Sequence, residues 1–321
     1  MFLCSFMFVP VLIGVDFLFR NSSIIVFKVQ GTTVALVTEV MAYRRNILPK
    51  VASDWIPFVG CILLILTSYL FEMLFIIPII YPAGHTMTYV HFCALTFIVA
   101  NILGNFLMLV LVDVSSTGMF LPTVLKPEWR YCYECEQNSP PRSHHCSLCN
   151  TCILRHDHHC PFTGGCIGHA NVRYYVAFLF YVAVGALYAN VMNVDYVVEE
   201  LGGLTLANVF MMVLPFFAWI AGYCRGWALF VSFMTAASLA ALLYDGFLLV
   251  YHAVLVAHGQ TTHESARKNR LYDLGLGRNL EQVFGMNWKL AWLFPLVPSP
   301  LPGDGLEFQT RKLPMETSKT L

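Results

Sequence analysis

The run from Thr88 to Val112 contains no charged residue and is long enough to cross a lipid bilayer as a helix. A bilayer core about 30 Å thick needs about 20 mainly apolar residues in helical form, because every backbone polar group inside it must be hydrogen-bonded. The whole chain is 57% hydrophobic and only 12% charged, whereas soluble domains carry about a quarter charged residues. The sequence therefore predicts a membrane protein, and its formal net charge of zero gives no support to a nucleic-acid partner.

Four other stretches are also rich in apolar residues. Three of them have spanning length: Pro57–Tyr81, Tyr174–Val194 and Trp227–Ala257. The remaining one, Leu206–Tyr223, would be only about 27 Å long as a helix, and Pro215 lies near its middle.

Positive charge predicts the orientation of these spans, because lysine and arginine near a membrane helix favour the cytosolic side. Arg44, Arg45 and Lys50 precede the first span, so the segment after the second span returns to the cytosol. The polar segment 258–277 also reads as cytosolic by its charge. An even number of spans must join these two segments, so we expect Leu206–Tyr223 not to cross.

Residues 1–40 do not fit this scheme well. Phe2–Phe19 is apolar apart from Asp16 and could be a signal sequence, an extra span or an error in the sequence; Met41 would also make a reasonable start. We expect the chain to divide into an N-terminal extension (1–40), a cytosolic segment with two spans (41–118), a cytosolic cysteine-rich domain (119–173), two spans with a long loop or hairpin (174–257) and a cytosolic C-terminal segment (258–321).

Seven of the eleven cysteines lie between Cys132 and Cys166, interleaved with histidines. Structural zinc takes four thiolate or imidazole ligands, and pairs spaced Cys-x-x-Cys commonly supply two of them. Two such pairs are present, Cys132 with Cys135 and Cys146 with Cys149. Each needs two more ligands, and spacing alone does not choose them from His144, His145, Cys152, His156, His158, His159, Cys160 and Cys166.

The block contains little apolar sequence, so metal must stabilise its fold. Two four-ligand sites would leave one cysteine beside a histidine and a carboxylate, in the run Asp157-His158-His159-Cys160. We expect the chemistry at that remaining thiol. The alternative is a purely structural zinc ribbon that docks a partner.

The spacing of the block closely resembles the signature of the DHHC protein S-acyltransferases, or palmitoyltransferases. Two later motifs occur in the matching order. Thr261-Thr262-His263-Glu264 resembles the family's Thr-Thr-x-Glu motif, and the segment 278–285, with Asn279, resembles its C-terminal element. The tail 299–310 resembles one branch of that family.

The resemblance implies a fold and two metal sites. The fold is an all-α polytopic membrane protein with four transmembrane helices and a cytosolic two-zinc cysteine-rich domain. Both zinc ions would be structural, because four protein ligands leave no open position. The implied ligands are Cys132, Cys135, His145 and Cys152 for one ion, and Cys146, Cys149, His159 and Cys166 for the other.

The resemblance also implies the activity, which is transfer of palmitate from palmitoyl-CoA to cysteines of membrane-associated substrate proteins. Cys160 would be the nucleophile, His158 its base and Asp157 the carboxylate that orients the imidazole, which is the triad arrangement applied to a thiol. The family expectation for location is the endoplasmic reticulum or the Golgi. Three arginines are candidates to pair with CoA phosphates, although each could be an ordinary solvated side chain: Arg142, Arg155 and Arg173.

Several positions depart from the common family pattern without removing a ligand or triad member. The usual Pro-Trp and Asn-Asn after the nucleophile are replaced, and Phe162, Gly164 and Gly165 stand there. These departures support one alternative, a catalytically weak, zinc-stabilised membrane scaffold that binds partners. A zinc transporter or sensor is a further alternative, but polar residues within the spans are too few for it.

Two carboxylates, Glu72 and Asp245, lie inside predicted spans, where an ionisable residue by default suggests function. We favour structural roles for both. Glu72 would mark a bend, and Asp245 would pair with a neighbour such as Asn101 or Asn105.

Overall fold

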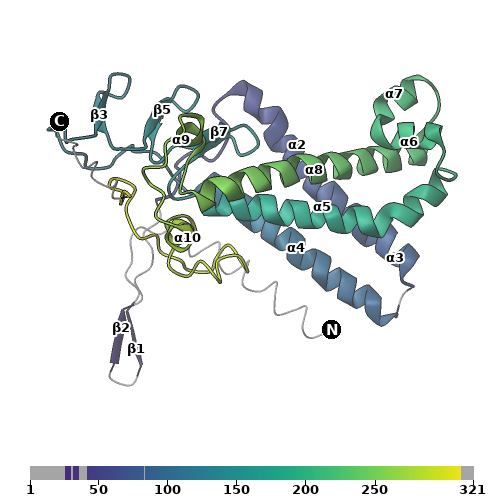
Figure 1. Cartoon of the computed structure of the whole chain (residues 1–321). Helices are drawn as coiled ribbons and strands as arrows, with labels where there is room; N and C mark the ends of the chain where they lie inside the picture. Colours follow the sequence, from purple (N-terminus) through teal and green to yellow (C-terminus); the bar gives the residue numbers. More distant parts are fainter. Residues whose placement is uncertain (1–25, 30–31, 36–41, 83, 312–321) are drawn as a thin grey trace, which may run out of the picture.

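Long helices form a bundle, and small β-hairpins with an irregular C-terminal segment cover one end of it (Figure 1). The computed structural model describes residues 26–29, 32–35, 42–82 and 84–311. The apolar stretch Phe2–Phe19 lies outside the described residues. Of the segment 1–40, the described part is a hairpin of β1 (Val26–Val29) and β2 (Thr32–Ala35).

Four helical segments in the described part of the chain are long and apolar enough to cross a membrane. The first combines η1 (Ala52–Asp54), α2 (Trp55–Phe71), η2 (Glu72–Ile76) and α3 (Ile77–Ile80); the others are α4 (Thr86–Leu111), α5 (Val172–Glu200) and α8 (Gly226–Ala257). The expected four-span helical fold is confirmed. The short hairpins of the cysteine-rich domain are β structure that this expectation did not include.

Helix α5 packs along both α4 and α8. Residues 172–179 at its start are all buried, and Tyr174 and Leu179 are among the largest fully buried side chains. Leucines elsewhere on the bundle face outward, including Leu63 on α2 and Leu243 on α8. Outward leucines are expected where lipid tails replace water around a helix, because the tails are as apolar as the side chains.

The stretch Leu206–Tyr223 forms two short helices, α6 (Leu206–Val213) and α7 (Pro215–Ile220). The break lies at Pro215, because proline lacks an amide hydrogen and its ring clashes with the preceding turn. Neither helix is long enough to cross a bilayer. Both lie at the end of the bundle opposite the cysteine-rich hairpins (Figure 1).

Glu72 begins η2, a turn of π-helix, at the position where a bend was expected. Its carboxylate accepts a hydrogen bond of 2.6 Å from Nδ2 of Asn193 on α5. The wider π turn therefore coincides with a polar contact between two spans, in which one carboxylate oxygen of Glu72 receives the hydrogen bond that lipid could not supply.

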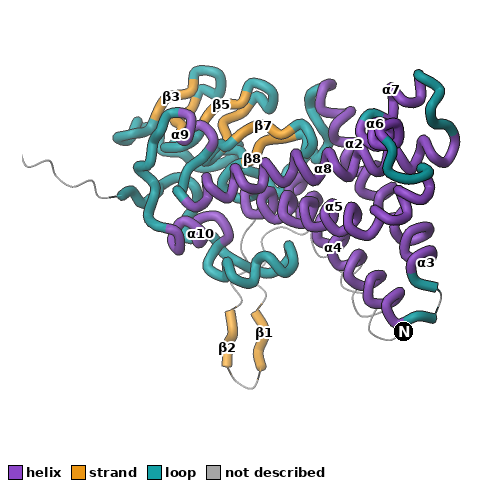
Figure 2. The backbone as a smooth tube through the Cα atoms, turned by 45° about the vertical axis from the view of Figure 1, so that its right-hand side comes forward, coloured by secondary structure: helices purple, strands orange, loops and turns teal. Residues whose placement is uncertain are grey.

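Between α4 and α5 the chain forms three antiparallel hairpins in succession. Figure 2 shows their strands gathered at one end of the molecule. The strands are β3 (Arg130–Cys132) with β4 (Gln137–Ser139), β5 (His144–Cys146) with β6 (Thr151–Ile153), and β7 (His158–Cys160) with β8 (Gly165–Ile167).

The three hairpins repeat one another at intervals of fourteen residues. Their first strands end at Cys132, Cys146 and Cys160. The turn residue four positions later has a positive φ each time, in the order Glu136, Asn150 and Gly164, with φ of 51°, 51° and 59°. Glycine adopts this left-handed conformation without the Cβ clash that other residues meet, so Gly164 suits the turn.

After α8 the chain folds back over the hairpins through α9 (Thr262–Ala266) and α10 (Leu276–Phe284). Asn279 on α10 is almost fully buried. Its Nδ2 donates to the carbonyl of Ala257 at 2.8 Å and to Asp273 Oδ1 at 2.8 Å, so it fastens this segment to the end of α8.

Candidate active site and zinc centres

The first and second hairpins bring together one predicted set of zinc ligands. The four side chains place a sulfur or imidazole nitrogen within 4.8 Å of one another: Cys132, Cys135, His145 and Cys152. His145 Nδ1 lies 3.6 Å from the sulfur of Cys132 and 3.2 Å from that of Cys135. Residues His145 and Cys152 face each other across the β5–β6 pair, which explains why ligands distant in sequence converge.

The second and third hairpins bring together the other set: Cys146, Cys149, His159 and Cys166. His159 Nδ1 lies 3.4 Å from the sulfur of Cys149 and 3.6 Å from that of Cys166. The other ring nitrogen, Nε2, lies 2.9 Å from Oδ2 of Asp54 in η1. A carboxylate on the distal nitrogen fixes the ring and its tautomer, as is usual behind metal-binding histidines.

Both sets fit zinc. Tetrahedral bonds of about 2.3 Å to sulfur and about 2.1 Å to nitrogen separate ligand atoms by about 3.5–3.8 Å, and most of the separations above lie close to that range. The eight ligands include six cysteines, all of which are free thiols rather than disulfides. Zinc held by these residues would be structural, since each set already supplies four ligands.

The third hairpin carries the triad residues. His158 Nδ1 lies 2.7 Å from Asp157 Oδ2, and His158 also hydrogen-bonds Cys160. Cys160 and Asp157 are buried, whereas His158 is partly exposed. The structure therefore brings together the three side chains to which the resemblance assigns the roles of nucleophile, base and orienting carboxylate.

The electrostatics of these three groups favour a thiolate. Burial disfavours the charged form of Cys160, but the hydrogen bond and charge of His158 outweigh it and lower the pKa of the thiol. Burial likewise disfavours protonated His158, but the hydrogen bond that His158 donates to Asp157 outweighs it and raises the pKa of the imidazole to about 9. Asp157 is buried too, yet its bond to His158 keeps the pKa of the carboxyl well below its usual range.

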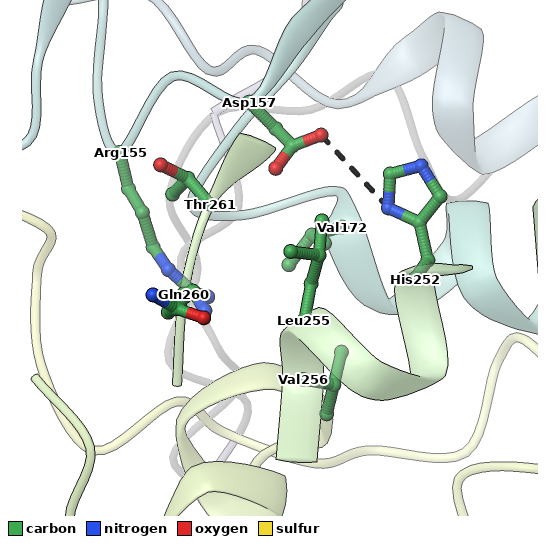
Figure 3. A pocket seen from close by; sticks show the side chains of 8 residues that line it. All are labelled: Arg155, Asp157, Val172, His252, Leu255, Val256, Gln260 and Thr261. Carbon is green, nitrogen blue, oxygen red and sulfur yellow. Dashed lines mark ion pairs between the residues drawn. The ribbon is translucent and has the colours of Figure 1, made fainter. Parts of the chain in front are cut away.

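A second histidine, His252 on α8, faces the same carboxylate, and the sequence interpretation missed it. Its Nδ1 lies 3.9 Å from Asp157 Oδ2 beside a small cavity of about 10 Å³ (Figure 3). Its ring centroid lies 5.6 Å from that of His158 and 4.9 Å from that of Tyr175. The only local signal was a histidine near the end of an apolar helix, which by itself indicates no contact.

Thr262 also holds Asp157. Its backbone amide donates to Oδ1 at 2.8 Å, and its hydroxyl donates to Oδ2 at 2.7 Å. Thr262 is fixed in turn because α9 begins with a capping box, in which Thr261 and Glu264 satisfy each other's backbone amides. The Thr-Thr-x-Glu motif thus acts directly on the triad carboxylate.

The three arginines that were candidates for CoA phosphates are all buried and bonded within the protein. Arg142 Nε and Nη2 donate to the two oxygens of Glu264, each at 2.7 Å. Arg155 Nη1 donates to the carbonyl of Gln282 at 3.3 Å, and Arg173 Nη1 to that of Ser299 at 3.0 Å. These contacts favour a role in fastening the C-terminal segment; the phosphate role stays a prediction.

A cavity of about 700 Å³ opens from Cys160 into the bundle. Its walls come from α2, α5 and α8, and its polar end is the triad hairpin with Thr262. Along α8 the lining runs from His252 to Ala237, about 22 Å at 1.5 Å per residue. An extended C16 acyl chain is about 20 Å long, given carbon–carbon bonds of about 1.5 Å, so the cavity matches such a chain in length.

Asp245 lies in the wall of this cavity, and the expected pairing with Asn101 or Asn105 is wrong. The amide of Asn101 bonds to the carbonyl of Phe97, and that of Asn105 bonds to the carbonyl of Asn101. Both amides thus donate to backbone carbonyls of their own helix, α4, instead of to the more distant carboxylate of Asp245.

The departures after Cys160 also have a structural reason. A Cβ atom at Gly165 would lie 1.6 Å from a guanidinium nitrogen of Arg44, and one at Gly164 would lie 2.7 Å from a ring carbon of Pro49. The segment preceding the first span therefore occupies the space that larger side chains at positions 164 and 165 would need.

Fold and site together define a class. It is a four-span helical membrane protein whose hairpin domain holds two four-ligand Cys/His clusters and presents a Cys-His-Asp constellation at the mouth of an apolar cavity. Residues 125–269 match the family model described as DHHC palmitoyltransferase. The chain is 38% identical over 226 residues to the probable palmitoyltransferase ZDHHC24 of Danio rerio, covering 69% of this chain and 76% of the relative. It is 37% identical over 231 residues to the human protein of that name, covering 71% and 81%.

Palmitoyltransferase ZDHHC20 of Homo sapiens is more distant, at 34% identity over 196 residues, covering 58% of this chain and 48% of the relative. This chain belongs to the DHHC palmitoyltransferase family. Within the family it belongs to the branch of the twenty-fourth mammalian member, as the tail resemblance indicated.

Proposed function

We propose that this protein transfers a palmitoyl group from palmitoyl-CoA to cysteines of membrane-associated proteins through an acyl-enzyme at Cys160. One observation carries the proposal. The thiol that the two zinc sets leave over is hydrogen-bonded to His158 and lies at the polar end of a cavity long enough for a C16 chain.

The first half of the reaction forms the acyl-enzyme. The Cys160 thiolate attacks the thioester carbonyl of acyl-CoA, a new carbon–sulfur bond forms, and the bond to the CoA sulfur breaks. The proton that Cys160 gave to His158 can then pass to the departing CoA thiolate. Asp157 holds the imidazole in the required tautomer and stabilises its positive charge.

The second half regenerates the enzyme. A cysteine thiol of the substrate protein gives its proton to His158 and attacks the acyl carbon, and Cys160 leaves as a thiolate. One thioester replaces another, so the exchange needs no further energy source.

The cavity explains why a long chain is accepted at a membrane surface. Each methylene removed from water contributes about 0.8 kcal/mol, and the cavity walls from α2, α5 and α8 are largely apolar. The chain can therefore stay in an apolar environment while its thioester reaches Cys160.

We further propose that the hairpin domain is cytosolic and that the membrane is that of the endoplasmic reticulum or Golgi. Arg44, Arg45 and Lys50, just before the first span, support the orientation. The family expectation supports the organelle. Fluorescence microscopy of the tagged protein, with protease protection of the hairpin domain in sealed vesicles, tests both.

The activity is tested by labelling the purified, zinc-loaded protein with an alkyne-tagged palmitoyl-CoA. We expect label that hydroxylamine removes in the wild type and no label in Cys160→Ser. Cys61→Ser is the matched control, because Cys61 is the other thiol lining the cavity and has no assigned chemical role.

Labelling that persists in Cys160→Ser, or that disappears in Cys61→Ser alone, would contradict the assignment of the nucleophile. Absent labelling in folded wild type would instead favour the scaffold alternative. Transfer to a substrate peptide that contains one cysteine tests the second half of the reaction.

A further inference from the structure

Three histidines outside the two zinc sets form a cluster of their own. His144 begins β5, His156 precedes the triad, and His263 lies in α9. The ring centroid of His263 is 4.7 Å from that of His144 and 5.2 Å from that of His156, and the last two are 6.3 Å apart. The sequence singled out His144 and His156 as possible metal ligands, but neither belongs to the two zinc sets.

His156 is the least satisfied member of the cluster. Its side chain is buried, with 7% of the residue exposed, and neither ring nitrogen has a hydrogen-bond partner. A buried polar atom without a partner costs free energy, which a bound ligand at the ring nitrogens would recover. Burial, with the neighbouring His263 adding to it, lowers the pKa of His156 to about 4. The ring is therefore neutral at pH 7, the form in which imidazole binds metals.

The spacing of the rings suits one shared ion. Imidazoles bound to a single zinc through nitrogens about 2.1 Å from the metal have ring centroids about 5 Å apart. The nitrogens are less closely grouped than those of the two predicted zinc sets, so the rings must rotate about their Cβ–Cγ bonds to converge.

We propose that His144, His156 and His263 form a third transition-metal site, taking zinc or a related ion with a strong preference for imidazole. Arg130 and Arg267 lie near His144, and their positive charges oppose a cation. Hard ions such as Mg²⁺ and Ca²⁺ prefer oxygen ligands and would gain too little from imidazole to overcome that repulsion.

Occupancy of this site would act on the triad through adjacent residues. His156 directly precedes Asp157, and His263 directly follows Thr262, whose amide and hydroxyl bond that carboxylate. One ion would thus join the two backbone segments that carry the Asp157–Thr262 contact. Helix α9 lies beside the β5 and β7 hairpins in both views, as this requires (Figures 1 and 2).

The test is a count of zinc atoms per protein after equilibrium dialysis of the full chain against buffered free zinc. We expect a third equivalent in the wild type and its loss in His263→Ile and in His144→Gln, each of which keeps the first two. His258→Gln is the matched control, since that histidine lies at the end of α8 outside the cluster. Added Mg²⁺ or Ca²⁺ should not displace the third equivalent.

A wild type that saturates at two zinc ions, or a third equivalent that survives in both variants, would overturn the proposal. The same measurement reports the two predicted structural ions, so a misfolded variant is recognised by their loss. Acyl labelling of Cys160 is scored separately, so failure of the third site is distinguishable from failure of the proposed activity.

Discussion

At the scale of single residues, the triad carboxylate is held by contacts from several elements. Asp157 accepts from His158 and twice from Thr262, and His252 approaches it at 3.9 Å. A carboxylate has about four acceptor positions, so these contacts nearly saturate it. Its orientation is therefore set by the neighbouring His158 together with Thr262 and His252, which lie more than ninety positions away in sequence.

His252→Phe keeps an aromatic ring against Tyr175 but removes the nitrogen that faces Asp157. We expect the rate of acyl-enzyme formation to fall about tenfold, because a lost contact of about 1.4 kcal/mol changes a rate by that factor. Single-turnover labelling measures it, and affinity for palmitoyl-CoA should be unchanged. His252→Gln, which retains a donor, should recover part of the rate. An unchanged rate in His252→Phe would show that the His252 side chain contributes only through packing and not through its contact with Asp157.

A second prediction concerns Arg142, whose guanidinium is buried against Glu264 and lies 4.2 Å from the ring centroid of Tyr272. Arg142→Met would strand a buried carboxylate, which typically costs about 3–5 kcal/mol. We expect a lower melting temperature, partly restored in the double variant Arg142→Met, Glu264→Gln. If Arg142 instead binds CoA phosphate, the single variant would weaken acyl-CoA binding while leaving the melting temperature unchanged.

At the scale of elements, α8 contributes both to the triad and to the cavity. His252 lies level with Asp157, and Asp245 lies about 10 Å further along the same helix, seven residues at 1.5 Å each. A carboxyl group in an otherwise apolar wall opposes an apolar chain, because its hydration must be given up.

Asp245→Leu should therefore favour long saturated chains. We expect the ratio of C16 to C10 acyl labelling, measured in competition between the two acyl-CoA species, to rise severalfold. Asp195→Leu is the control, since Asp195 is on α5 and does not line the cavity. A ratio that stays constant in Asp245→Leu would show that chain choice is set elsewhere in the wall.

The sequence predicted those features that local patterns encode. The four spans follow from runs of apolar residues, and the resemblance named eight ligands that the structure gathers into two clusters. The sequence did not predict His252 beside Asp157, Thr262 on the same carboxylate, or Asp245 in the cavity wall. These contacts join segments that meet only when α8 and α9 fold back on the hairpins, and neither spacing nor hydropathy reports such a contact.

At the scale of the whole molecule, the hairpin domain has only a small apolar core of its own, so we expect metal to stabilise it. Its buried apolar cluster contains Val114 and Ile153, and the other members are the ligand cysteines Cys146, Cys149 and Cys166. Removing zinc with a strong chelator should therefore unfold the domain. We expect rapid proteolysis between residues 125 and 170 and loss of acyl labelling, while the helical circular dichroism persists. A chelated domain that stays protease-resistant would contradict this dependence.

The fourteen-residue repeat of the hairpins has a consequence for the reactive thiol itself. Cys160 occupies the position of Cys132 and Cys146, but three residues later Thr163 stands where the earlier hairpins have Cys135 and Cys149. Thr163 is buried and its hydroxyl bonds the Cys160 carbonyl at 3.3 Å. Thr163→Cys would complete a third chelating pair with Cys160, so added zinc should abolish acyl labelling of that variant and mild chelation should restore it. The threonine at this position therefore leaves the Cys160 thiol without a second thiol beside it that could help bind zinc.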